Sequence, residues 1–193
     1  MELNRKIFRE YDIRGVYEED LKGDIPYYLG KGFGTIVKRA GKKTVCIGGD
    51  NRLTTPEIKE KLFKGILKTG CDVIDTGIVP TPVLYFSIHR YGFDAGVMVT
   101  ASHNPPEFNG FKMVLGNKSL YGKEIQQVAD IIENEDFEIG KGRSSKKDAV
   151  QDYINLMLEK FRFERKLRVA MDTGNGTLGP VIVPLFEKMS IDF

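Results

Sequence analysis

The segment Thr100-Ala101-Ser102-His103-Asn104-Pro105 places a hydroxyl, an imidazole and an amide on consecutive residues directly after an apolar stretch. A serine hydroxyl in such a loop is a candidate nucleophile, and the two neighbouring side chains can orient it through hydrogen bonds. Ser and Asn are also good turn formers, because their side chains satisfy local backbone groups. An adjacent histidine is not by default the base of a serine, since that base normally comes from elsewhere in the fold. From these residues alone, catalysis and turn formation both stay open.

Two more polar loops, Gly48 to Arg52 and Val79 to Pro82, also follow apolar strand-like stretches. In parallel sheets the carboxyl ends of the strands meet helix N-termini, whose free N–H groups favour anions. We therefore expect the three loops to converge on one anion-binding edge. Lys112, considered alone, is typical of an exposed strand lysine, and Asp50 with Arg52 of an exposed ion pair.

The elements that must position these loops alternate between helix and strand. Apolar stripes of helical period, ended by glycines, predict helices at 24–40, 55–69, 82–91 and 122–133, the second opened by a Thr54/Glu57 capping box. Apolar runs predict strands at 45–47, 71–74 and 95–100, with a hairpin beginning at 111–115. Strands without a polar face indicate a three-layer α/β/α fold whose mixed sheet is mostly parallel.

Residues 1–147 are expected to form this first domain, and residues 148–193 the incomplete start of a second, similar one. The Gly-, Ser- and Lys-rich stretch 140–147 is typical of a solvated linker. After it, the pattern predicts a helix, a strand at 167–171, a glycine turn and a last helix ending near Met189. Two elements without a complete core should stay mobile or pair with another copy, and their many apolar residues favour self-association.

Composition excludes several classes of function. A net charge of +2 with interspersed signs gives no field suited to nucleic acid, and no apolar run approaches the ~20 residues that cross a bilayer. The N-terminus lacks a signal-peptide pattern, so a cytoplasmic location is expected. Cys46 and Cys71 lie far apart beside apolar stretches and are expected to be buried free thiols.

Five motifs occur in an order that identifies a family resemblance. They are Phe8-Arg9-Glu10-Tyr11-Asp12-Ile13-Arg14-Gly15, Gly48-x-Asp50-x-Arg52, Val79-Pro80-Thr81-Pro82, Thr100-Ala101-Ser102-His103-Asn104-Pro105 and Asn109-Gly110-Phe111-Lys112. Together they resemble the first-domain motifs of α-D-phosphohexomutases, closest to the bacterial phosphomannomutase/phosphoglucomutase branch. The resemblance implies an isomerase that moves phosphate between the 1 and 6 positions of mannose or glucose, through a hexose 1,6-bisphosphate intermediate.

The same resemblance implies the catalytic roles. Ser102 would be the phosphoserine that gives its phosphoryl group to a hexose phosphate and later receives the other phosphate. Lys112 and Arg14 would supply positive charge, which a phosphoryl group in transfer requires, and Lys112 would also move a proton at the sugar hydroxyl. His103 would belong to this catalytic set.

The remaining implied site residues orient or support that set. Tyr11 and Asn104, with His103, would line the cleft and orient the phosphate or the serine loop. Asp50 and Arg52 would brace that loop from behind.

Magnesium is the implied cofactor, bound to a phosphoserine oxygen as a hard cation that prefers oxygen ligands. The family's Asp-Gly-Asp-x-Asp-Arg metal loop and Gly-Glu-x-Ser-Gly-His sugar loop do not occur in this sequence. Ser102, through its phosphate, is thus the only metal ligand expected from this chain. We expect the chain by itself to be a truncated, inactive part of the enzyme.

Two alternatives stay open from the sequence. The chain could serve as a non-catalytic sugar-phosphate-binding or assembly module. A less favoured reading is a dinucleotide-binding fragment, because Gly174 to Gly179 fits Gly-x-Gly-x-x-Gly between a predicted strand and a predicted helix. The other glycine repeat, Gly30 to Gly34, follows no strand and indicates helix packing.

Overall fold

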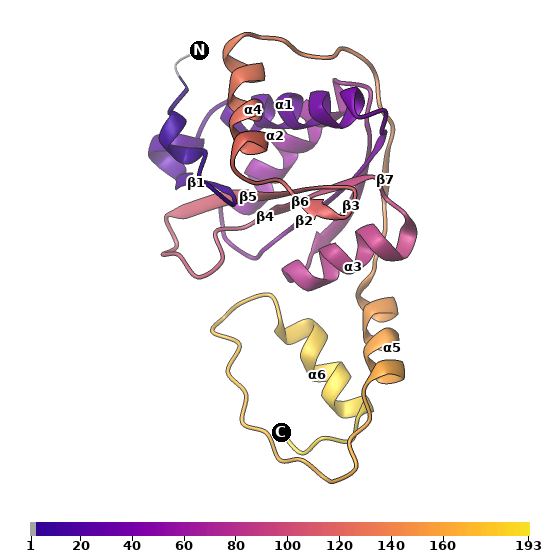
Figure 1. The fold of residues 1–193 in the computed structure, drawn as a ribbon. Helices are drawn as coiled ribbons and strands as arrows, with labels where there is room; N and C mark the ends of the chain where they lie inside the picture. Colours follow the sequence, from indigo (N-terminus) through magenta and orange to yellow (C-terminus); the bar gives the residue numbers. More distant parts are fainter. Residues whose placement is uncertain (1–2) are drawn as a thin grey trace.

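The computed structural model describes residues 3–193, which are built around one seven-stranded mixed sheet (Figure 1). The strand order is β1-β5-β4-β2-β3-β7, with β6 beside β5. Strands β4, β2, β3 and β7 run parallel, while β5 is antiparallel to β4, β1 and β6. The strands are β1 (Ile13–Val16), β2 (Thr44–Gly49), β3 (Asp72–Ile78), β4 (Ala95–Val99), β5 (Phe108–Leu115), β6 (Lys118–Ser119) and β7 (Ser144–Lys146).

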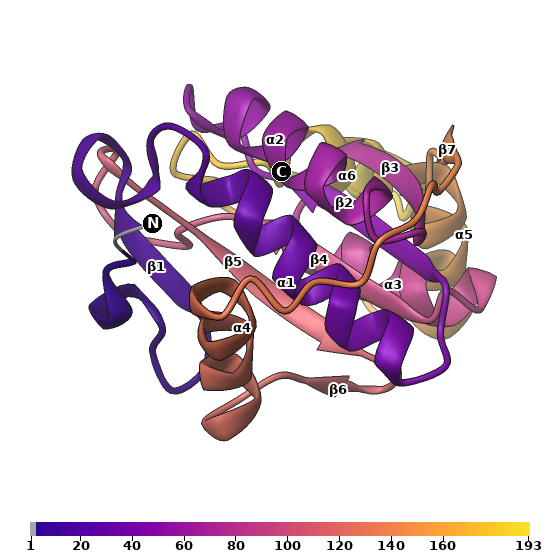
Figure 2. The same ribbon diagram turned by 90° about the horizontal axis from the view of Figure 1, so that it is seen from above.

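Helices cover both faces of the sheet, which confirms the predicted three-layer α/β/α class. Helices α1, α2 and α4 lie over one face and α3 over the other (Figures 1 and 2). The helices are α1 (Ile25–Arg39), α2 (Thr55–Leu67), α3 (Thr81–Tyr91), α4 (Lys123–Glu133), α5 (Val150–Lys160) and α6 (Gly179–Lys188), with short turns η1 (Arg5–Ile7) and η2 (Tyr17–Leu21).

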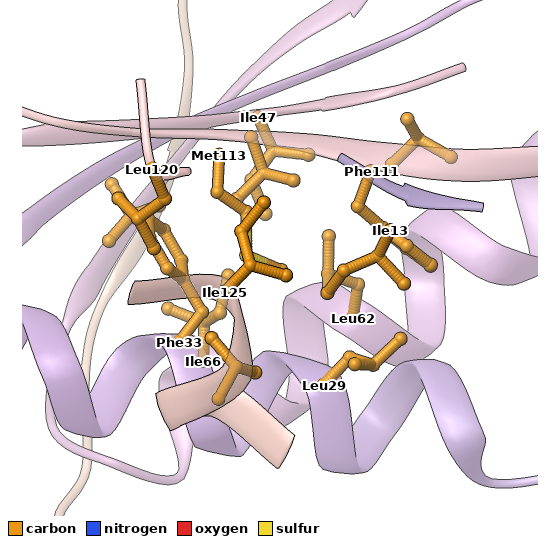
Figure 3. Close-up of a cluster of buried hydrophobic side chains, with 14 of the residues drawn as sticks. Ile13, Leu29, Phe33, Ile47, Leu62, Ile66, Phe111, Met113, Leu120 and Ile125 are labelled. Carbon is orange, nitrogen blue, oxygen red and sulfur yellow. The ribbon is translucent and has the colours of Figure 1, made fainter. Parts of the chain in front are cut away.

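The larger core lies between the sheet and helices α1, α2 and α4 (Figure 3). Phe33 and Leu62 from the helices and Phe111 from β5 belong to this core, and all three are fully buried. Glycines let α1 and α2 approach closely: a methyl group at Gly30 would overlap the Leu62 carbonyl. The glycine repeat in α1 is therefore a packing device, as its position in a helix indicated.

The predicted capping box at the start of α2 was wrong, because tertiary contacts outcompeted it. Thr54 makes no capping hydrogen bond at the start of α2; its hydroxyl accepts one from the Asn109 side chain at 2.9 Å. Glu57 bonds Tyr17 and Lys61 instead of closing a capping box. The Asn109 side chain of β5 thus donates the hydrogen bond that the Thr54 hydroxyl would have accepted from the first turn of α2.

The predicted linker 140–147 was also partly wrong, since it contains strand β7. Its residues pair in parallel with β3, from Val73 opposite Ser144 to Asp75 opposite Lys146. The open edge of β3 has backbone groups that need partners, and a polar exposed segment can supply them through its own backbone. Gly142 is required there, because a side chain at this residue would collide with the Cys71 carbonyl.

Residues 148–193 form α5, a long irregular segment and α6, and the strand predicted at 167–171 is wrong. Only an isolated bridge joins Arg168 to Asp192. The apolar residues of α6 are not left over for a missing sheet: Val181 and Leu185 are buried in a second core with α5 residue Ile154 and α3 residue Leu84. This second core ties α5 and α6 to the α3 face of the sheet.

Both cysteines are buried and free, as predicted. Burial raises the pKa of the Cys46 thiol to about 12 and also raises the pKa of Cys71. Among residues 3–193, no helix combines the length and apolarity that a membrane crossing requires.

Candidate functional site

The three polar loops converge on one cavity of about 630 Å³ at the carboxyl end of the parallel strands. Asp50 follows β2, Pro80 follows β3 and Ser102 follows β4, and all three line this cavity. Backbone hydrogen bonds fix the loops to their neighbours: Asp50 donates to the Val99 carbonyl at 3.0 Å. The convergence follows from parallel pairing, because parallel strands all end at the same edge.

Ser102 lies at the tip of its loop in a left-handed conformation, with φ of 57°. This conformation is uncommon for residues other than glycine and marks a backbone that its surroundings hold in place. The Ser102 amide donates to the Thr100 hydroxyl at 2.9 Å, and the Asn104 amide donates to the Ala101 carbonyl at 3.1 Å. Ser102 Oγ is exposed and lies 3.3 Å from His103 Nδ1. The hydroxyl is therefore presented to the cavity with an imidazole beside it.

Arg52 holds this loop by its backbone. Its guanidinium donates to the carbonyls of Asn104 and Pro105 at 2.6 Å each and to those of Ser102 and Phe108 at 3.1 Å each. Asp50 fixes the guanidinium from behind, with Oδ2 at 3.2 Å from Nε. The pair is largely buried, with side-chain exposures of 11% for Asp50 and 13% for Arg52. This geometry is a brace rather than an exposed ion pair.

Arg14 and Lys112 approach the serine loop from strands β1 and β5. Arg14 Nη1 donates to the Asn104 side chain, and Arg14 Nη2 forms an ion pair with Asp12. Lys112 Nζ lies 3.2 Å from the same Asp12 carboxylate. Two cations thus share one buried carboxylate next to the loop.

Tyr11 and Lys112 line a different cavity, of about 460 Å³, together with Tyr85 and Tyr121. Tyr11 is 74% exposed and makes no side-chain hydrogen bond among the described residues. The structure therefore divides the predicted site residues. Ser102, His103, Asn104, Asp50 and Arg52 surround the larger cavity, Tyr11 and Lys112 the smaller one, and Arg14 lies between them through its bond to Asn104.

The glycine turn 173–177 forms part of the larger cavity's wall, which sequence reasoning missed. The Asn51 side chain donates to the Asn175 carbonyl at 2.7 Å and links the turn to the β2 loop. The turn does not follow a strand, so the Gly174 to Gly179 match lacks the strand that a dinucleotide fingerprint needs.

Two more residues escaped prediction. Asn109 is fully buried and donates to both Thr54 and Thr55, at 2.9 and 3.0 Å, which fixes the β2 loop against β5. Asp12 lies within the first of the five motifs, and only the pairing of β1 with β5 brings it to Lys112. The available signal for Asn109 was its place in the Asn109-Gly110-Phe111-Lys112 motif.

The described residues do not by themselves fit a magnesium site. Nowhere in residues 3–193 do three His, Cys, Asp or Glu side chains gather in a way that could hold a metal ion. The carboxylates of Asp50 and Asp12 are occupied, Asp50 by Arg52 and Thr55, and Asp12 by two cations.

Comparison with known proteins decides the family. Residues 5–139 match the model of phosphoglucomutase/phosphomannomutase, alpha/beta/alpha domain I. The chain belongs to this family. It is 36% identical over 187 residues to the phosphomannomutase/phosphoglucomutase of Pseudomonas aeruginosa and, over an equal length, 36% identical to the phosphoglucomutase of Neisseria meningitidis.

A crystal structure of a phosphoglucomutase/phosphomannomutase family protein from Burkholderia thailandensis superposes on this family member with a TM-score of 0.95 at 36% identity. The match covers 99% of the chain and 43% of that structure. The chain likewise spans 40% of the length of the Pseudomonas relative. The family assignment thus covers nearly all of this chain and less than half of its relatives.

Proposed function

We propose that the chain is the phosphoryl-carrying part of a phosphohexomutase that interconverts hexose 1-phosphate and hexose 6-phosphate, with mannose or glucose as the sugar. The observation that carries the proposal is Ser102, held in a left-handed conformation with its hydroxyl exposed to the larger cavity. Family membership supports the reaction class, since the relatives are named phosphomannomutases and phosphoglucomutases.

The proposed reaction consists of two phosphoryl transfers, each of a different phosphoryl group. The bond from phosphorus to Ser102 Oγ breaks as a bond forms to a hydroxyl of the bound hexose phosphate, which gives a hexose 1,6-bisphosphate. The sugar hydroxyl loses a proton and the serine oxygen takes one up; Lys112, ion-paired with Asp12, is the candidate to give its proton to the serine oxygen and regain one from the hydroxyl. After the bisphosphate turns over, the other phosphate returns to Ser102.

The residues of this chain support that transfer by position and charge. Charge spreads over the equatorial oxygens of a phosphoryl group in transfer, so fixed cations lower the barrier. Arg14 and Lys112 supply the charge, Asn104 and His103 orient the phosphate or the loop, and Arg52 holds the loop's backbone. Tyr11 is proposed to contact the substrate from the smaller cavity.

Magnesium is proposed to take only a phosphate oxygen on Ser102 from this chain, with its carboxylate ligands supplied from outside it.

We also propose that residues 148–193 begin a second domain, because β7 completes the first sheet just before that point.

Phosphate mapping on the longer parent protein tests the proposal. Mass spectrometry should locate incorporated phosphate on Ser102, and Ser102→Ala should abolish both labelling and mutase turnover. Ser190→Ala is a matched control, since Ser190 is exposed and also has a positive φ, of 54°. Wild-type turnover in the Ser102→Ala protein would refute the phosphoserine assignment.

A further inference from the structure

Asp12 is the carboxylate at the centre of the cationic part of the site. Its exposure is 9%, and its side chain is bound by Arg14 Nη2 and by Lys112 Nζ, the latter at 3.2 Å. Through Nη1, the same guanidinium bonds the Asn104 side chain. A continuous chain of contacts therefore runs from Lys112 through Asp12 and Arg14 to the serine loop.

The sheet register explains why Asp12 reaches both cations. Strands β1 and β5 pair antiparallel with Ile13 opposite Phe111 and Arg14 opposite Gly110. Extending this register by one residue puts Asp12 opposite Lys112, where opposite charges on paired strands interact directly.

Arg14 depends on these contacts for its orientation. Its Nε is the one buried side-chain nitrogen or oxygen without a hydrogen-bond partner among residues 3–193. The guanidinium is thus fixed only through its two Nη groups, one on Asp12 and one on Asn104. Without Asp12, the guanidinium would keep only its contact to the Asn104 side chain.

We propose that Asp12 is a positioning residue of the phosphate site, which holds Arg14 and Lys112 in place and, through Arg14, holds the Asn104 end of the serine loop. The phosphate ligand rests on the proposed function, whereas the anchoring is a property of this chain. When Asp12 is neutralised, the proposal predicts a change in anion affinity opposite to the one that electrostatics alone predicts. Removing a negative charge beside an anion site should strengthen anion binding by Coulomb attraction. Loss of positioning should weaken it.

The first experiment needs no ligand. In ¹⁵N spectra of the chain, hindered rotation should give resolved signals for the Arg14 guanidinium. Asp12→Asn should broaden these signals. It should also shift the backbone amide signals of Ser102 and Asn104. Asp24→Asn, with the same charge change at an exposed residue before α1, should leave all these signals unchanged. Unchanged Arg14 and loop signals in Asp12→Asn would overturn the proposal.

Asn104→Ala provides a second variant should Asp12→Asn fail to fold. It removes the other Arg14 contact, so the loop amides should shift while Arg14 keeps hindered rotation at Nη2 on Asp12. Free rotation of the whole Arg14 guanidinium in Asn104→Ala would show that Asp12 does not hold it, and would also overturn the proposal.

Titration with inorganic phosphate, followed by the same loop amides, tests the sign. Asp12→Asn should bind phosphate about tenfold more weakly, the size that loss of one charge-assisted hydrogen bond produces, and Asp24→Asn should match wild type. Equal or tighter binding by Asp12→Asn would contradict positioning. If the wild-type loop does not respond to phosphate, the proposed function loses its phosphate site, while the Arg14 signals still decide the role of Asp12.

Discussion

Removing the Arg52 side chain should destabilise the chain strongly through the serine loop. Arg52→Ala deletes four hydrogen bonds to loop carbonyls and leaves Asp50, whose side chain is 11% exposed, without its cation. Breaking one side of a largely buried pair costs about 3 to 5 kcal/mol, because the remaining charge is uncompensated. Ser102 and Pro105 are exposed residues, so water can replace the two bonds to their carbonyls, and these should not add to this sum.

Urea unfolding followed by far-UV circular dichroism measures the effect. Arg143→Ala is the matched control: its side chain is 84% exposed and pairs with Asp72 at 3.2 Å, so about 0 to 1 kcal/mol is expected. Amide exchange should also accelerate in residues 102–108 of Arg52→Ala and remain unchanged in that segment of Arg143→Ala. Equal free energies of unfolding for the two variants would contradict the role of Arg52 in holding the serine loop.

Three further outcomes are expected. Burial raises the pKa of Cys46 to about 12, so the thiol stays neutral in the folded chain at a pH where it ionises in the unfolded chain, above its usual pKa of 9.0. The free energy of unfolding should therefore fall as pH rises from 9.0 toward about 12. In Cys46→Ala, the urea midpoint should fall less steeply with pH over this range. Gly65→Ala should cost about 1 to 3 kcal/mol in urea unfolding, since its methyl would overlap the Tyr27 carbonyl between α1 and α2, whereas Gly179→Ala, with open space, should cost under about 1 kcal/mol. The chain alone should show no turnover of glucose 1-phosphate or mannose 1-phosphate in a coupled assay, and robust turnover would contradict this expectation.

The sequence by itself determined the first domain's elements and the loops of the site. Apolar stripes such as Leu29, Phe33 and Val37 specify a helix because the residues that share a face recur at its period. The apolar runs around Ile47 and Val97 specify buried strands because neither of their faces meets water. Loops that follow parallel strands must then meet at one edge, so the neighbourhood of Asp50, Ser102 and Pro80 was readable in advance.

Only the tertiary structure decided which groups pair inside that neighbourhood. Ser144–Lys146 became a strand and Leu167–Met171 did not, because strand formation depends on a free sheet edge more than on side-chain pattern. The Thr54 hydroxyl went to Asn109 because β5 offered a buried amide that needed a partner. Asp12 came to serve two cations because the β1–β5 register set it opposite Lys112. Each outcome depends on groups distant in sequence competing for the same hydrogen bonds, and a local pattern carries no information about that competition.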